Sequence, residues 1–177
     1  MFKTKKLCVV SMFIALTVVL SYLSGFLRVG NISKISISFI SVYLSAVAYG
    51  PVIGGFVGAC ADIVSYIVNP TGVFLWPLSI IEFFYGFLFG SLFYNDFKQK
   101  SKKNFNLMKI IICVIIRFLA DLFLKTPVLI NAGYLPESYC GAFLLRLPSV
   151  LLMAVIQLVI LILINRFSKR LIELIRS

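Results

Sequence analysis

The sequence contains no histidine, and only six of its 177 residues are acidic. Histidine is the commonest metal ligand and a frequent general acid or base, so its absence argues against both kinds of chemistry. No GxxxxGK[ST], GxSxG or HExxH motif occurs, so the sequence predicts neither ATP hydrolysis nor a common hydrolase. We therefore expect no enzymatic activity and no cofactor.

The four cysteines are far apart, and none of them forms a CxxC pair. They are Cys8, Cys60, Cys113 and Cys140. Each lies in or beside an apolar stretch, and we expect each to be a small buried hydrophobic residue. We expect no metal site.

Charge is also scarce, because 13% of the residues are charged whereas about 25% is usual in soluble domains. Hydrophobic residues make up 61% of the chain, and long apolar runs recur along it. These runs predict an all-α integral membrane protein with six transmembrane helices in one bundle, forming a single domain over residues 1–177. The expected helices lie near residues 7–26, 35–49, 51–68, 75–94, 107–124 and 141–164. The second run is short, so we expect its neighbours to shelter it from lipid.

The net charge of +11 comes largely from three basic clusters, near residues 3–6, 98–103 and 166–176. Nucleic acid is one partner that such a charge suggests, but this distribution follows the positive-inside rule of membrane proteins. With six helices the three clusters fall on one side. We expect that side, with both the N- and C-termini, to be cytoplasmic, with membrane lipids around the bundle and no nucleic-acid partner.

Small residues mark the expected packing faces of two helices. Gly50, Gly54 and Gly58 recur every four residues before Asp62, and Gly86 and Gly90 repeat the spacing. Such spacing lets helix backbones approach closely in a membrane. Packing alone explains these glycines, and they indicate no function by themselves.

Acids inside membrane helices are costly and are candidates for a functional site. Counting 1.5 Å per residue places Asp62, Glu82 and Asp121 in the same outer half of the bundle. Arg117, Asp121 and Lys125 share one helix face, since they are four residues apart. We expect this helix to end near Pro127.

Two interpretations of these charges remain open. Arg117 and Asp121 either neutralise each other as a stabilising pair or belong to a binding site. Lys125 and Arg146 either extend to the membrane surface as anchors or form the cationic rim of an outward-open pocket for an anion. Arg28 and Lys34 would add to such a rim.

Aromatic residues cluster near the same end of the expected bundle. They are Tyr66, Phe74, Trp76, Tyr134 and Tyr139. An aromatic belt at the membrane surface and stacking on the ring of a ligand explain them equally well.

Three stretches resemble the substrate-binding S components of energy-coupling factor (ECF) vitamin transporters, folate type. They are "KISISFISVYLSAVAYGPVIGGFVGACADIV", "FLWPLSIIEFFYGFLFGSLF" and "FLLRLPSVLLMAVIQLVILILI". Folate-type members carry an Asn-Thr pair after the fifth helix, and "LKTPVL" keeps Thr126 but has Lys125 in place of Asn. The three stretches occur in the same order as in the family, and together the resemblance covers most of the chain.

The resemblance implies that the chain binds a vitamin, with folate expected, from outside a bacterial plasma membrane. It also implies as partners a transmembrane coupling protein and two ATPase subunits, which supply the energy for uptake. Members of the family dock through small residues of the first helix, for which this chain offers Ser11 and Ala15.

For a folate-like ligand, we expect one of Asp62, Glu82 or Asp121 to accept hydrogen bonds from the pterin edge. Basic residues would bind the ligand's carboxylates, and aromatic residues would stack on its rings. The basic candidates are Lys125, Arg146 and Arg28. The aromatic candidates are Tyr66, Phe74 and Trp76. The resemblance adds Thr126 as a further residue of the expected site.

Three alternatives remain open at the level of sequence. The first is an S component for another anionic vitamin such as pantothenate. The second is a small intramembrane enzyme that uses one of the buried acids. The third is a scaffold subunit whose buried charges only stabilise the bundle.

Overall fold

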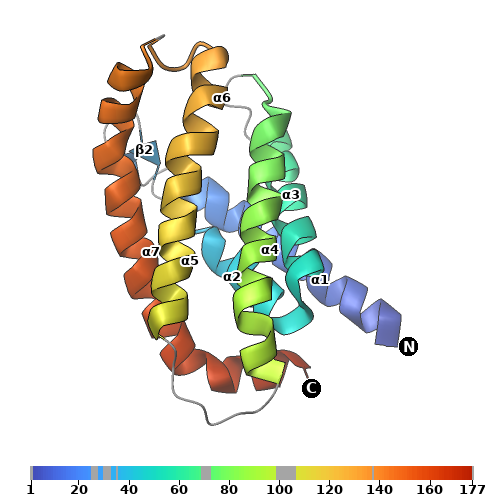
Figure 1. The fold of residues 1–177 in the computed structure, drawn as a ribbon. Coiled ribbons are helices and arrows are strands. Elements are labelled where there is room, and N and C mark those ends of the chain that lie inside the picture. Colours follow the sequence, from blue (N-terminus) through green and yellow to red (C-terminus); the bar gives the residue numbers. More distant parts are fainter. Residues whose placement is uncertain are drawn as a thin grey trace.

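The computed structural model describes residues 2–24, 28–29, 33–34, 36–68, 73–98, 107–136 and 138–176 (Figure 1). Along the chain the elements are α1 (Phe2–Ser24), β1 (Arg28–Val29), β2 (Ser33–Lys34), α2 (Phe39–Tyr49), α3 (Pro51–Val68), α4 (Trp76–Lys98), α5 (Leu107–Ala120), η1 (Asp121–Lys125), α6 (Thr126–Asn131) and α7 (Tyr139–Arg176). The segment η1 is a π-helix that joins α5 to α6 without a break. Counting α5, η1 and α6 as one helical run, the predicted six-helix bundle is confirmed.

Four helices in the described part of the chain are long and apolar enough to cross a membrane. They are Thr4–Ser24, Pro51–Val68, Trp76–Asn95 and Tyr139–Ile164. The other two expected spans differ from this pattern, because α2 has only 11 residues and η1 interrupts the fifth span. The bundle therefore combines four full-length helices with one short and one irregular helix.

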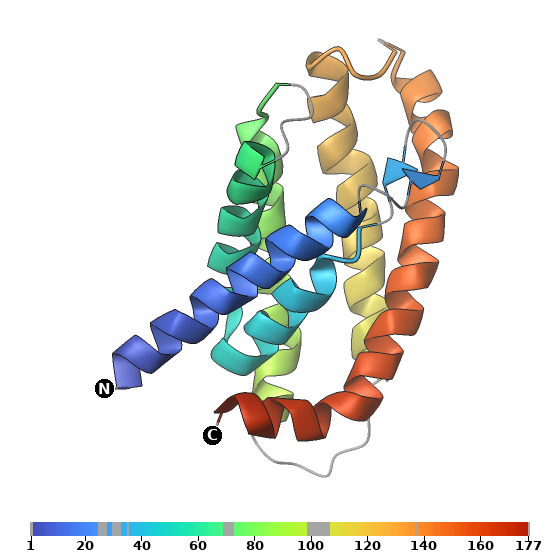
Figure 2. The ribbon, with the colours of Figure 1, turned by 180° about the vertical axis from the view of Figure 1, so that it is seen from behind.

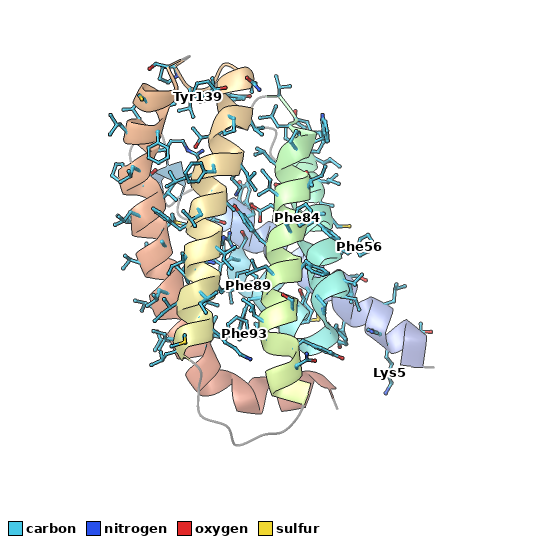
Figure 3. All side chains as sticks on the ribbon, viewed as in Figure 1. Lys5, Phe56, Phe84, Phe89, Phe93 and Tyr139 are labelled. Carbon is cyan, nitrogen blue, oxygen red and sulfur yellow. The ribbon has the colours of Figure 1, made fainter. Side chains whose placement is uncertain are left out.

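The short helix α2 is almost completely enclosed, as expected for a segment too short to span lipid alone. Tyr43, at its middle, has no exposed surface and packs edge-on against Phe89 and Phe93 of α4, with ring centroids 5.5 and 5.4 Å away. Figure 3 shows Phe89 and Phe93 inside the bundle, whereas Phe56 and Phe84 lie on its outer surface, where each is more than half exposed. The apolar periphery matches a lipid environment.

The break between α2 and α3 has a local cause. Gly50 adopts φ 101°, a conformation that L side chains rarely adopt, and its N–H donates to Ala46 O at 2.9 Å. Pro51 then occupies the first position of α3, where the missing N–H costs nothing. The chain can thus reverse without a loop.

Two features of the described structure were not predicted from the sequence. The first is a small antiparallel hairpin between α1 and α2, in which β1 pairs with β2. The second is the length of α7, which we expected to end near residue 164. Instead it continues to Arg176, and its last part turns across the base of the bundle (Figure 1).

The helices α3 and α4 touch backbone to backbone through the glycines that the sequence marked as packing residues. A Cβ atom at Gly86 would collide with the carbonyl group of Gly54, and one at Gly58 would lie 2.7 Å from Glu82 O. The helix α1 packs obliquely over α2 and α3 (Figure 2). Close glycine contacts therefore fix the register of α3 on α4, and with it the height of Glu82.

Replacing Gly86 by alanine is expected to lower the free energy of unfolding by about 1–3 kcal/mol, because the new methyl group meets backbone that cannot rotate away. Gly141→Ala is the matched control, since its Cβ would lie 3.7 Å from Ser138 and cause no clash. Thermal unfolding in detergent measures both variants. Equal melting temperatures for the two variants would contradict the close contact.

Candidate binding cavity in the outer half of the bundle

The short helix α2 leaves space above its N-terminus. Its 11 residues extend about 16 Å, roughly half the thickness of the hydrocarbon core. A cavity of about 180 Å³ lies beyond Phe39, the first residue of α2. Its walls come from α4, α5, η1 and α7, and its lining residues are Ser36, Phe39, Glu82, Arg117, Phe118, Asp121, Lys125, Arg146, Ser149, Val150, Met153, Ala154 and Gln157.

One face of α7 borders the cavity. Arg146 and Gln157 mark the two ends of this face and lie eleven residues apart, which corresponds to about 16 Å along a helix. Arg146 is closer to the end of the bundle formed by α6, which we call the outer end. The cavity lining therefore extends along about three turns of α7.

Lys125 is held by two carboxylates that line this cavity. Its Nζ atom lies 2.8 Å from Glu82 Oε1 of α4 and 3.0 Å from Asp121 Oδ1 on its own helical run. Tyr85 donates its phenolic hydrogen to the same Asp121 oxygen at 3.0 Å. The ammonium group and the Tyr85 hydroxyl therefore tie η1 to α4.

Arg117 is only 8% exposed and is surrounded mainly by aromatic rings. Its guanidinium carbon lies 4.5 Å from the centroid of Tyr85 and 5.7 Å from those of Phe39 and Phe89. Its Nε atom is 4.0 Å from Asp121 Oδ2, at the limit of an ion pair. Cation–π attraction therefore offsets part of the free-energy cost of burying this guanidinium group.

Arg146 differs from the other two cations of the cavity. Its Nη1 atom donates to Thr126 Oγ1 at 2.9 Å and to the backbone oxygen of Asp121 at 3.4 Å. Among the described residues, no carboxylate lies within ion-pair distance of it. The cavity therefore contains three cations and two carboxylates, and the excess positive charge belongs to Arg146.

The π-helix η1 positions both Asp121 and Lys125. A π-turn has i→i+5 hydrogen bonds and is wider than an α-turn. Pro127 follows it and lacks the N–H that an α-helix would use. Our expectation that the helix ends at Pro127 is wrong, because α6 continues to Asn131; the wider turn gives the proline ring the room that an α-helix denies it.

The structure brings together five of the residues that we selected for the site. Glu82, Asp121, Lys125 and Arg146 line the cavity, and Thr126 is bonded to Arg146. The Arg28 side chain lies outside the described residues. The position of these residues is compatible with the expected site but leaves their roles as proposals.

The other four selected residues lie elsewhere. Asp62 accepts a hydrogen bond from Ser79 of α4 at 2.6 Å and is not among the residues that line the cavity. Tyr66 packs on Phe74 with a centroid distance of 5.0 Å, and Trp76 is 66% exposed. None of the described lining residues comes from α3, because this helix packs against α1, α2 and α4.

Our site prediction from the sequence did not include several lining residues. Arg117 was left between a stabilising pair with Asp121 and a place in the site, and the sequence prediction did not include Ser149 and Gln157 of α7. Gln157 interrupts an otherwise apolar run, "LLMAVIQLVILILI", which was the available signal. In the part of the chain described, no three cysteine or acidic side chains are grouped so that they could hold a metal ion.

Comparisons with known proteins agree on a class of transporter subunit. The model of a family described as "ECF-type riboflavin transporter, S component" matches residues 1–169. The folate transporter FolT of Clostridium novyi (strain NT) is 32% identical over 85 residues, which is 48% of this chain and 48% of that protein. The match thus spans about half the length of this curated relative.

A solved structure supports the fold. The chain resembles the crystal structure of FolT bound with folic acid with a TM-score of 0.72, 23% sequence identity and 88% coverage of each chain. At this level of identity the likeness shows the fold alone.

Proposed function

We propose that this chain, which belongs to the family of ECF-type riboflavin transporter S components, binds folate in the cavity beside α7 and presents it for uptake. The chain is a multi-pass membrane protein, and we place its cavity on the outer side of a bacterial plasma membrane. The observation that carries the choice of ligand is the excess positive charge of the lining, centred on Arg146.

Charge separates the two vitamins that the related proteins name. Riboflavin is neutral at pH 7, whereas the glutamyl part of folate carries two carboxylates. In a membrane interior an unpaired guanidinium is costly, and a ligand carboxylate compensates it with charge-assisted hydrogen bonds. The folate transporter of Clostridium novyi supports the same choice.

The extent of the cavity lining along α7 also suits an elongated molecule such as folate. We propose that the glutamyl carboxylates lie at the outer end, near Arg146 and Lys125, and that the pterin ring lies deeper. The volume of about 180 Å³ is smaller than the roughly 300–1,000 Å³ of typical ligand pockets. We therefore expect the cavity to widen when folate enters, with rearrangement of the ion pairs around Lys125.

The proposed partners are a transmembrane coupling protein and two ATPase subunits, since an S component has no phosphate-binding motif of its own. We propose Ser11 and Ala15 of α1 as the docking face. Both residues are exposed, and Val19, one turn further, is 54% exposed. Small residues on an exposed helix face allow a second membrane helix to approach closely.

Binding of radiolabelled folate to the purified protein in detergent tests the proposed ligand, with riboflavin and pantothenate as competitors. We expect folate to stabilise the protein against heat, by about 2.7 kcal/mol at a concentration 100 times its Kd. Neither competitor should displace folate at equal concentration. Stabilisation by riboflavin or pantothenate but not by folate would refute the choice of ligand.

A further inference from the structure

The inner end of the cavity contains a polar group that has no partner. Gln157 is 6% exposed, it lines the cavity, and its Nε2 atom forms no hydrogen bond with any described residue. A buried donor without an acceptor costs about 1–3 kcal/mol, so such groups are rare unless a ligand or water completes them. An apolar residue would fill this position of α7 at lower cost.

The surroundings of Gln157 suggest which kind of atom it binds. Arg117 lines the same cavity, and its guanidinium group provides only hydrogen-bond donors. The carboxylates that line the cavity are engaged by Lys125. The inner end therefore offers donors without a free acid, and it is complementary to a hydrogen-bond acceptor of the ligand.

We propose that the side-chain amide of Gln157 donates a hydrogen bond to a ring carbonyl of the ligand and so selects oxo-substituted heterocycles. This inference rests on the proposed function, in which the pterin ring of folate lies at the inner end of the cavity. The acceptor is then the 4-oxo group of the pterin. Gln157 acts as a specificity residue, distinct from the basic residues that bind the carboxylates at the outer end.

Aminopterin provides the test, because an amino group replaces the 4-oxo group of folate and the neighbouring ring atom N3 loses its hydrogen. The donors and acceptors of this edge are thereby exchanged, and the remainder of the molecule is the same. Wild-type protein is expected to bind folate about tenfold more tightly than aminopterin, since Gln157 would face a donor instead of an acceptor. The preference is a ratio of two Kd values measured on one preparation. It is therefore independent of the fraction of protein that is folded.

Two variants and one control extend the test. In Gln157→Met the preference should fall about tenfold, mainly through weaker binding of folate, and in Gln157→Glu it should fall further because a carboxylate accepts from the amino group. Val159→Ala is the matched control: Val159 lies on α7 two residues from Gln157, is 49% exposed and is not among the residues that line the cavity. Its preference should equal that of the wild type.

The outcomes separate this inference from the proposed function. Equal binding of folate and aminopterin by the wild type, or an unchanged preference in Gln157→Met, would overturn the role of Gln157 while folate binding stands. Failure of the wild type to bind folate would overturn the proposed function, and this inference with it. A loss of preference in Val159→Ala as large as in Gln157→Met would also overturn the specific role of Gln157.

Discussion

Replacing Lys125 by alanine is expected to lower the free energy of unfolding by about 3 kcal/mol, the lower end of the range for breaking a buried ion pair. The ammonium group is the common partner of Glu82 and Asp121, at 2.8 and 3.0 Å. Without it, the two carboxylates remain in the membrane interior with Arg117 as the nearest described cation, 4.0 Å from Asp121. The side chain of Lys125 is 19% exposed, which is why we choose the lower end of the range.

Thermal unfolding in detergent, without ligand, measures this loss. Lys5→Ala is the control, because it removes the same charge from an exposed position near the start of α1 (Figure 3). Adding Glu82→Gln to Lys125→Ala should restore part of the stability, since only Asp121 then needs a cation. A melting temperature of Lys125→Ala equal to that of Lys5→Ala would show that the ion pairs contribute nothing to the fold.

The relation within one helix was predictable from the sequence, because spacing alone decides it. Arg117, Asp121 and Lys125 recur every four residues, and the structure pairs the first with the second and the second with the third. The glycine stripe of α3 was predictable for the same reason, since a smooth face every four residues permits close packing. The number of helices was also predictable, because each long apolar run of the sequence forms one helical segment.

Relations between helices were not predictable, because they depend on register and rotation. Glu82 and Asp62 both appeared to lie in the outer half of the bundle, but only Glu82 faces the cavity, since α3 packs on the other elements through its glycines. Tyr66 lies on α3 and packs on Phe74, so for the same reason neither aromatic residue lines the cavity. The position of a residue along a helix can be counted from the sequence, whereas the direction in which its side chain points relative to other helices requires the structure.

Two other features had weak signals or none. Pro127 suggested that the helix ends there. The structure instead has the wider turn of the π-helix η1 just before the proline, and the helical run continues. The cavity itself arises because α2 begins only at Phe39, halfway through the bundle. Only the short apolar run near residues 35–49 hinted at this, and it predicted a sheltered helix without indicating the space above it.

Arg146→Ala is expected to weaken the binding of folate by about 10- to 100-fold, the range for a lost charge-assisted hydrogen bond. Arg146 is the cation of the cavity that lacks a carboxylate partner in the described structure, so its free donors are available to the ligand. Arg146→Lys should give an intermediate loss, because it keeps the charge but not the planar fork that binds two oxygens. Stability without ligand should change little, since the variant loses mainly the hydrogen bond to Thr126.

Folic acid dimethyl ester, in which both carboxylates are blocked, identifies the group that Arg146 binds. If the guanidinium binds a ligand carboxylate, the ester binds the wild type at least as weakly as folate binds Arg146→Ala, because it also loses the carboxylate contact near Lys125. The ester then loses little more affinity in that variant. A double-mutant cycle between ligand and protein then gives a coupling close to the whole effect. Equal losses for folate and its ester in Arg146→Ala would instead mean that Arg146 acts by shaping the cavity, and unchanged folate affinity would remove it from the site.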